Sequence, residues 1–556
     1  MKRLLDLVFI QVLLFLAIHL VLHRLLEMLL SKTRVTTLPE WVTSIDTLEC
    51  IDLVGCKELV ELPKGIVSLK RLEVLNVLLC SKLRCMPSGF GQLTRLRRLG
   101  LFAVGCSGDG SRISELENLH MISGNMQITN LEHLKDPTDA AKACLKQKTS
   151  IKLLEFVWST SGMEKGIVSD IEQDLGVLNA LEPSPQVGRL DITGYRGPCL
   201  PHWMSEESVS SYWEGAILKK TSPCQFHCLS ELVLKKLPNL KHLRGLVELP
   251  SLEFFYLHGM PNLEELWTTT CSSEIGDEEL RVQHCFPILS SLLIIDCPKL
   301  NVKPYFPPSL ESMTVKESNE QLLSPGSFFH LLPPLVSESS SSSSTHVVAP
   351  RFNRLNLEKM TGSSSGWEFL RLLTALKTLE IRSCGDLTQL PESMRSLTSL
   401  RDLHIEECPV LATLPDWIGE LRSLRQLGVR GTSMIAGFPQ SIVHLTSLVG
   451  LSIGRCGNLK QLPEAIQHLT SLEHLWLEDC DELTMLPECI GQLSALQWLR
   501  IWKCSALRSL PSSIQRLTAL QHLEISGCPG LTERYKKGVG DDWHLVSHIP
   551  NVVIRE

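Results

Sequence analysis

The sequence lacks the short motifs that mark most enzymes and nucleotide-binding proteins. Its 556 residues contain no G-x-x-x-x-G-K-[ST] phosphate loop, no H-E-x-x-H and no paired C-x-x-C. A backbone cradle for ATP and a zinc site of these types are therefore not assigned. We expect a protein that is not an enzyme and that needs no cofactor or metal ion.

The chain also has few aromatic residues and no excess of positive charge. Aromatic residues make up 6% of the sequence and the net charge is -7, so we expect no nucleic-acid partner, which would require clustered Lys and Arg. No Asn begins an N-x-[ST] sequon, which argues against a long secreted ectodomain. Hydrophobic residues make up 43% of the chain, enough for a folded core.

A leucine-containing pattern recurs at a fixed interval. Its first leucine occurs every 24 residues from Leu376 to Leu520, within L-x-x-L-x-I-x-x-C-x-x-L-x-x-L-P-x-x-I-x-x-L. The same step separates Leu48, Leu72 and Leu96. This is the leucine-rich-repeat signature. We predict an α/β fold, a leucine-rich-repeat horseshoe with a parallel concave sheet and short convex helices, preceded by an N-terminal hydrophobic helix.

One copy of the repeat explains the pattern in physical terms. In Leu472–Cys480, the alternation of a strand turns Leu475 and Leu477 toward the core and Trp476 toward solvent. Cys480 follows where the chain turns, and its thiol suits a buried place near backbone carbonyls. Pro487 suits the first position of a helix. No single copy buries its apolar face alone, so neighbouring copies must stack.

The 19 cysteines fit this repeat better than a disulfide framework. Eight of them recur at the turn of a regular copy, with Thr432 at the corresponding position of one copy. We therefore expect a series of reduced, buried thiols with a structural role.

The chain divides by pattern into segments. We expect a hydrophobic N-terminal helix at 1–32, regular repeats at 33–106, irregular repeats at 107–336, a Ser-rich flexible insertion at 337–350, regular 24-residue repeats at 351–527 and a C-terminal cap at 528–556.

The N-terminal segment leaves two interpretations open. Its apolar run, residues 7–22, would span about 24 Å as a helix, which is short of the ~30 Å hydrocarbon core of a bilayer. Either residues 4–30 associate with a membrane, with basic residues placing the repeats in the cytosol, or the helix is buried against the first repeat.

Longer stretches of the sequence resemble one family. "ITNLEHLKDPTDAAKACLKQKTSIKLLEFVWS" (128–159), "LEPSPQVGRLDITGYRGPCLPHWM" (181–204) and the ending "CPGLTERYKKGVGDDWHLVSHIPNVVI" (528–554) are similar to the leucine-rich-repeat region of plant coiled-coil-type nucleotide-binding disease resistance proteins. The resemblance implies a cytoplasmic, non-catalytic module in plant defence. Its partner would be a pathogen effector or a host protein bound on the concave face.

The resemblance also has a clear gap. The nucleotide-binding domain and Met-His-Asp triplet of such receptors are absent, so ADP or ATP binding is not carried over. Two alternatives stay open: a scaffold for intracellular signalling, since Ras-pathway repeat proteins share L-P-x-x-I-x-x-L, and a membrane-anchored receptor-like protein.

Stacked repeats would align their outward residues in columns about 4.8 Å apart. The three columns are Thr378, Asp402, Gln426, Gly450, His474, Trp498, His522; then Glu380, His404, Gly428, Ser452, Trp476, Arg500, Glu524; then Arg382, Glu406, Arg430, Gly454, Glu478, Trp502, Ser526. Exposed Trp and Arg dominate many protein interfaces. The predicted binding residues are Trp476, Trp498, Trp502, Arg500, His474 and His522, unless another part of the chain covers the rings.

Overall fold

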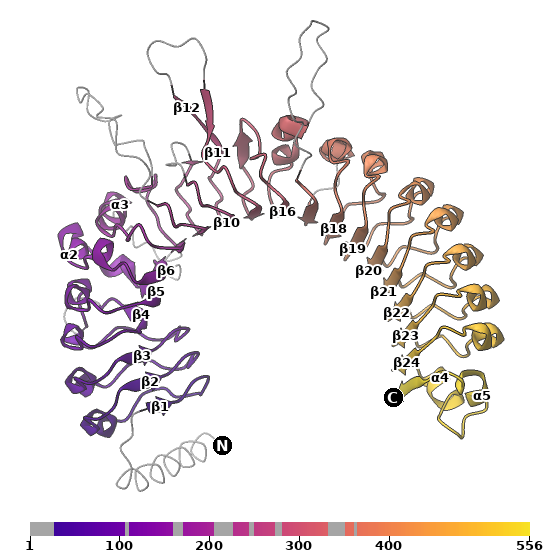
Figure 1. The fold of residues 1–556 in the computed structure, drawn as a ribbon, viewed down its shortest axis with the longest axis horizontal. Coiled ribbons are helices and arrows are strands. Elements are labelled where there is room, and N and C mark those ends of the chain that lie inside the picture. Colours follow the sequence, from indigo (N-terminus) through magenta and orange to yellow (C-terminus); the bar gives the residue numbers. More distant parts are fainter. Residues whose placement is uncertain are drawn as a thin grey trace, which may run out of the picture. The chain divides into compact units, whose positions relative to one another are not determined.

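The protein is built from parallel strands, one contributed by each repeat (Figure 1). The computed structural model describes residues 27–105, 110–159, 171–204, 226–243, 249–272, 281–331, 351–360 and 364–556. The chain divides into unit 1, residues 1–263 and 270–286, and unit 2, residues 264–269 and 287–556. In each unit the strands form the inner wall and the helical turns form the outer wall (Figure 1).

Unit 1 contains two parallel sheets. The first consists of β1 (Glu27–Leu29), β2 (Cys50–Asp52) and β3 (Val74–Asn76). The second consists of β4 (Gly100–Ala103), β5 (Gly124–Thr129), β6 (Ile151–Val157), β7 (Arg189–Thr193), β8 (Glu231–Lys235) and β10 (Phe254–His258). Strand β9 (His242–Leu243) also lies in unit 1.

Unit 2 contains the regular repeats and one continuous parallel sheet. Its strands are β14 (Ser291–Ile295), β16 (Ser312–Lys316), β17 (Arg354–Glu358), β18 (Thr378–Arg382), β19 (Asp402–Glu406), β20 (Gln426–Arg430), β21 (Gly450–Gly454), β22 (His474–Glu478), β23 (Trp498–Trp502), β24 (His522–Ser526) and β25 (Asn551–Arg555). Strand β11 (Glu265–Trp267) pairs in parallel with β15 (Asn301–Lys303). Strands β12 (Thr269–Ser272) and β13 (Arg281–His284) pair with each other and, apart from Thr269, belong to unit 1.

The outer wall consists mostly of short 3₁₀ turns. In unit 1 these are η1 (Glu40–Ser44), η2 (Lys64–Ser68), η3 (Phe90–Gln92), η4 (Ile113–Asn118), η5 (Leu131–His133) and η6 (Leu145–Gln147), with helices α2 (Pro137–Ala141) and α3 (Ile171–Ala180). In unit 2 they are η7 (Glu320–Leu323), η8 (Pro325–Leu331), η9 (Ser364–Leu372), η10 (Glu392–Ser396), η11 (Asp416–Glu420), η12 (Gln440–His444), η13 (Glu464–His468), η14 (Glu488–Gln492) and η15 (Ser512–Arg516), with helices α4 (Pro529–Arg534) and α5 (Trp543–Val546).

The repeat proline lies one position earlier than the sequence suggests. Pro487 has φ -70° and ψ 147°, so it is extended and caps η14 instead of opening it. Its carbonyl accepts the N–H of Ile490 at 3.1 Å, the i+3 bond of a 3₁₀ turn. The ring still suits this place, because it fixes φ near the value that the extended residue needs.

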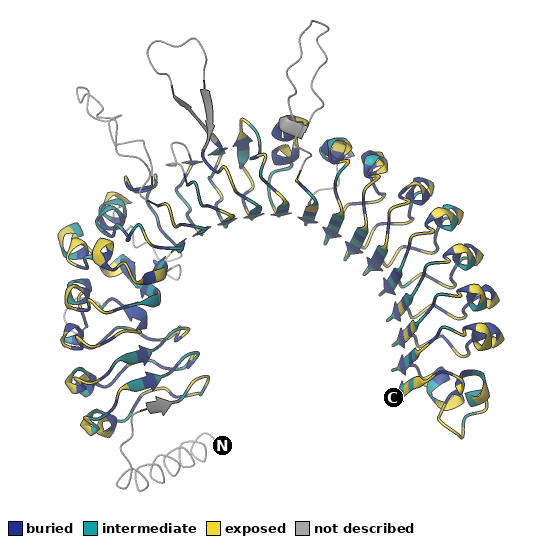
Figure 2. Cartoon of the chain, viewed as in Figure 1, coloured by how far each residue is buried: buried dark blue, intermediate teal, exposed yellow. Residues whose placement is uncertain are grey.

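The core of each unit is the row of leucines between the two walls (Figure 2). Leu475 and Leu477 are fully buried, as expected from the strand alternation. The turn cysteines are buried too, and the Cys480 thiol donates to the carbonyl of Glu478 at 3.4 Å. Thr432 is also buried where a cysteine would stand, with its hydroxyl 3.3 Å from the Cys456 sulfur.

Two expected segments lie largely outside the described residues. The Ser-rich insertion at 337–350 lies wholly outside them, and so does most of the hydrophobic helix expected at 1–32. Where that helix was expected to continue, Glu27–Leu29 instead form β1, which pairs with β2. Among the described residues, no helix has both the length and the apolar character needed to cross a bilayer.

Candidate functional site

The six predicted binding residues lie on three neighbouring strands of unit 2. His474 and Trp476 are on β22, Trp498, Arg500 and Trp502 are on β23, and His522 is on β24. The parallel register pairs His474 with Trp498, Trp476 with Arg500, and Trp498 with His522. The alternation that buries Leu475 and Leu499 therefore turns these residues to the inner face, in the columns that the 24-residue period predicts.

Four of these residues form a continuous row of rings, which we call the aromatic row: Trp476, His474, Trp498 and His522. The Trp498 and His522 rings are stacked, with centroids 3.7 Å apart and planes 16° from parallel. The His474 ring lies 6.4 Å from that of Trp498 and 6.1 Å from that of Trp476. Such contacts hold the rings in place, so the row is a preformed surface.

The indoles of the aromatic row remain accessible to solvent. Trp476 is 41% exposed and Trp498 is 43% exposed, so neither the C-terminal cap nor any other described segment covers them. An exposed indole is unusual, because Trp ordinarily buries most of its large apolar surface. The two exposed indoles are therefore the feature of this face that most needs a functional explanation.

Trp502 differs from the other two indoles. It is only half-buried, and two cations lie over its ring: the Lys503 ammonium at 4.6 Å and the Arg500 guanidinium at 5.8 Å. These cation–π contacts occupy its faces within the chain itself. The structure thus separates Trp502 from the aromatic row, although the sequence pattern grouped all three indoles.

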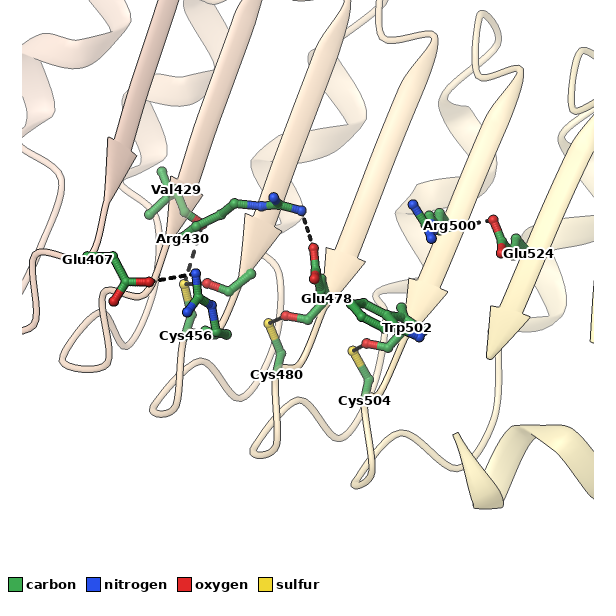
Figure 3. Close-up of polar contacts among 12 residues, drawn as sticks. Glu407, Val429, Arg430, Cys456, Glu478, Cys480, Arg500, Trp502, Cys504 and Glu524 are labelled. Carbon is green, nitrogen blue, oxygen red and sulfur yellow. Dashed lines mark hydrogen bonds and ion pairs between the residues drawn. The ribbon is translucent and has the colours of Figure 1, made fainter. Parts of the chain in front are cut away.

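Charged side chains on the inner face are paired with one another (Figure 3). Arg500 on β23 lies 3.3 Å from the Glu524 carboxylate on β24. Arg430 on β20 pairs with Glu478 on β22, passing over the intervening strand. The sequence columns contain these residues, but they do not reveal that a pair can skip a strand.

A second strand-skipping pair lies at the turns. Arg455 and Glu407 belong to alternate repeats, and their side chains are 2.6 Å apart. In both cases a glycine occupies the position between the partners: Gly454 for Arg430–Glu478 and Gly431 for Glu407–Arg455. In the sequence, each pair is marked by a glycine with a positively charged residue 24 positions away on one side and a negatively charged residue 24 positions away on the other.

The inner-face glycines do not leave bare backbone. Neighbouring side chains lie over them, because a methyl group added to Gly450 would meet Gln426 at 2.0 Å and one added to Gly428 would meet His404 at 2.5 Å. A similar group on Gly454 would meet Arg430 at 3.3 Å. A partner backbone could therefore not approach these glycines closely without displacing the side chains that lie over them.

The Cys80 and Cys489 thiols are poor nucleophiles, and the described residues offer no metal ligand set. Burial raises the pKa of Cys80 to about 11 and that of Cys489 to about 12, so these thiols are protonated at neutral pH. Within the described part of the chain, no group of three or more His, Cys, Asp and Glu residues is arranged to hold a metal ion.

The fold and its repeating columns define the class: this is a leucine-rich-repeat protein. Residues 113–260 match the family described as R13L1/DRL21 leucine-rich repeats, and residues 359–485 match a leucine-rich repeat region.

The relatives of this chain indicate which kind of leucine-rich-repeat protein it resembles. Over about half of its length the chain is similar to plant disease resistance proteins. It is 31% identical to the putative disease resistance RPP13-like protein 1 of Arabidopsis thaliana, over 51% of this chain and 29% of that protein. It is 28% identical to the disease resistance protein RGA2 of Solanum bulbocastanum, over 54% of this chain and 26% of that protein. The chain thus spans under a third of these relatives' length.

One solved structure is similar to this chain over about half of its length. The leucine-rich repeat domain of a type III effector is 24% identical and covers 48% of this chain and 77% of that chain, with a TM-score of 0.33.

Proposed function

We propose that the chain is a non-catalytic recognition module of the plant defence response, and that the inner face of unit 2 binds another protein. The observation that carries this proposal is the aromatic row, with two indoles that the rest of the described chain leaves open. Trp supplies large contact area at a small entropic cost and is enriched at the energetic centres of protein interfaces.

The repeat architecture supports the same function. A solenoid presents a wide surface whose outward residues can vary without disturbing the leucine core beneath them. The similarity to plant disease resistance proteins supports a role of the repeats in defence. The partner proposed is a pathogen effector or a host protein, and the proposed location is the cytoplasm, where the thiols of the turn cysteines stay reduced.

The test is affinity capture of plant proteins, from healthy and infected tissue, with wild-type chain and a Trp476→Ala/Trp498→Ala variant. We expect a protein held by the wild type to be lost by the variant, while the melting temperature changes little because the indoles are exposed. Trp41 is 37% exposed on the outer wall of unit 1, so Trp41→Ala is the matched control and should retain the partner. Equal capture by wild type and double variant would refute the proposed surface.

A further inference from the structure

We propose that the partner places an uncharged, bulky apolar or aromatic side chain against the open flank of Trp476, above Ser452. This inference rests on the proposed function and specifies the chemistry of its partner. It follows from two independent observations: the sizes of neighbouring side chains across β20–β22, and the internal pairing of the charges around them.

The first observation is an abrupt change in side-chain size along one column. The register places Gly428, Ser452 and Trp476 side by side on β20, β21 and β22. Two small residues therefore precede a large one, and the flank of Trp476 that faces β21 meets only a serine side chain in its own column. We call this change in height the Ser452–Trp476 step.

Longer side chains lie on both sides of Ser452, which forms the floor of the step. Gln426 extends over Gly450 at one end of β21, and Arg430 extends over Gly454 at the other end. Ser452 lies between these two glycines on the same strand. The floor is thus bordered by Gln426, Arg430, the Trp476 indole and, on the β20 side, His404, which lies over Gly428. This arrangement suits one inserted side chain and not an extended backbone.

The second observation is that the charges around the step are already compensated. Arg430 pairs with Glu478, Arg455 pairs with Glu407 at 2.6 Å, and Arg500 pairs with Glu524 at 3.3 Å. Lys503 lies over the Trp502 ring, at the turn beyond β23. A charged partner group would have to compete with these internal pairs, whereas an apolar group would bury the Trp476 flank without breaking any of them.

The experiment pans a phage-displayed library of random peptides on the purified full chain. Enriched peptides are compared with those from Trp476→Ala, Ser452→Trp and Thr378→Trp variants, each checked by circular dichroism and melting temperature. Ser452→Trp fills the floor of the step. Thr378→Trp adds the same ring on β18, three strands or about 14 Å from Ser452, and is the matched control.

We expect the enriched peptides to share Trp, Phe, Leu or Ile and to carry little net charge. For a synthetic peptide of that sequence, the Kd should change less than about twofold between about 50 mM and about 500 mM NaCl. Trp476→Ala and Ser452→Trp should each weaken binding by about 30-fold or more, and Thr378→Trp by less than about twofold.

Two results would overturn the inference in distinguishable ways. Enrichment of strongly charged peptides with a steep salt dependence, or undiminished binding to Ser452→Trp, would refute the apolar anchor while leaving a protein-binding face. No enrichment over the Trp476→Ala/Trp498→Ala variant would refute the proposed function and this inference together. If Ser452→Trp fails to fold, Trp476→Ala and the salt dependence still decide the outcome.

Discussion

The residue before each turn cysteine has an unusual backbone conformation. It lies in the left-handed region, as at Ser383 with φ 54° and Asp479 with φ 53°. Its N–H continues the ladder, since Ser383 donates to the carbonyl of Glu406 and Asp479 to that of Trp502. The left-handed residue therefore turns the chain away from the sheet. The residues at this position in the regular repeats are Gly55, Leu79, Lys359, Ser383, Glu407, Gly431, Arg455, Asp479, Lys503 and Gly527, where Lys359 precedes Met360 and Gly431 precedes Thr432.

The first prediction concerns the cost of that conformation. A left-handed non-glycine residue costs roughly 1–2 kcal/mol, and glycine recovers most of it apart from its own chain entropy. Ser383→Gly should therefore raise the free energy of unfolding by up to about 1 kcal/mol, measured by urea denaturation. The reverse change, Gly55→Ala, should lower the free energy of unfolding by about 1 kcal/mol. The added methyl group meets only Lys32, at 3.4 Å, so the change tests the cost of the φ of 73° without a steric clash. Opposite signs would contradict this account.

The second prediction concerns the pH dependence of stability at Cys80. Its buried thiol donates to the Leu53 carbonyl at 3.2 Å, and burial raises its pKa from 9.0 to about 11. The folded state thus favours the neutral thiol, so its contribution is complete below about pH 9 and is lost as the pH rises through about 11. The free energy of unfolding should fall more steeply across this window in the wild type than in Cys80→Ala. Parallel curves for the two proteins would show that Cys80 ionises alike in both states.

At the scale of the elements, the strand-skipping ion pairs depend on glycine. The Arg430 side chain crosses β21 at Gly454, where any larger side chain would occupy its path. Each such pair links a repeat to its second neighbour, whereas the backbone ladder links only adjacent strands. These contacts add local stiffness to β19–β22, although exposed pairs contribute little energy individually.

The third prediction tests this dependence with a double-mutant cycle. Arg430→Gln and Glu478→Gln should show a coupling energy of roughly 0.2–1 kcal/mol in urea denaturation at low salt. The same cycle in a Gly454→Leu background should show a coupling near zero, because the leucine displaces the arginine. Gly457→Leu in the same repeat is the control, since its added methyl group meets nothing closer than 3.8 Å. A coupling that survives Gly454→Leu would show that the pair does not need the glycine.

At the scale of the whole molecule, stability comes from contacts between neighbouring repeats, so the last repeat needs a cap. The chain after β24 forms α4 and α5 and then returns as β25, which pairs with β24. Tyr535 is fully buried there, and its hydroxyl accepts the Leu510 N–H at 2.9 Å. This bond fastens the cap to the outer wall of the preceding repeat.

The fourth prediction is that damage to the cap stays local. Tyr535→Phe leaves the Leu510 N–H without its acceptor, at a cost of roughly 1–3 kcal/mol. Because each repeat contacts mainly its neighbours, hydrogen exchange should quicken in β24 and β25 and remain unchanged in β18–β20. Leu475→Ala is the comparison: it opens a cavity in the middle of the array, costs roughly 2–5 kcal/mol and should weaken β21–β23. A uniform loss of protection from Tyr535→Phe would show that unit 2 unfolds as one body.

Much of the fold was predictable because the period leaves little freedom. Repeats of 24 residues with leucines at fixed positions bury those leucines when equivalent residues of successive repeats stack in parallel strands. The inner-face columns follow from the same step, and the register confirms them from Thr378 to Ser526. The buried thiol at Cys480 also follows, since only a small, weakly polar side chain suits that turn.

The sequence by itself therefore determined the repeat, the sheet, the core and which residues face inward, because these depend on spacing along the chain. Only the tertiary structure decided how the inward residues meet: that His522 stacks on Trp498, that cations cover Trp502, and that Arg430 reaches past Gly454 to Glu478. The physical reason is that long side chains extend beyond the position that the backbone gives them. Spacing fixes where a side chain begins, whereas its rotamer and the size of its neighbours fix where it ends.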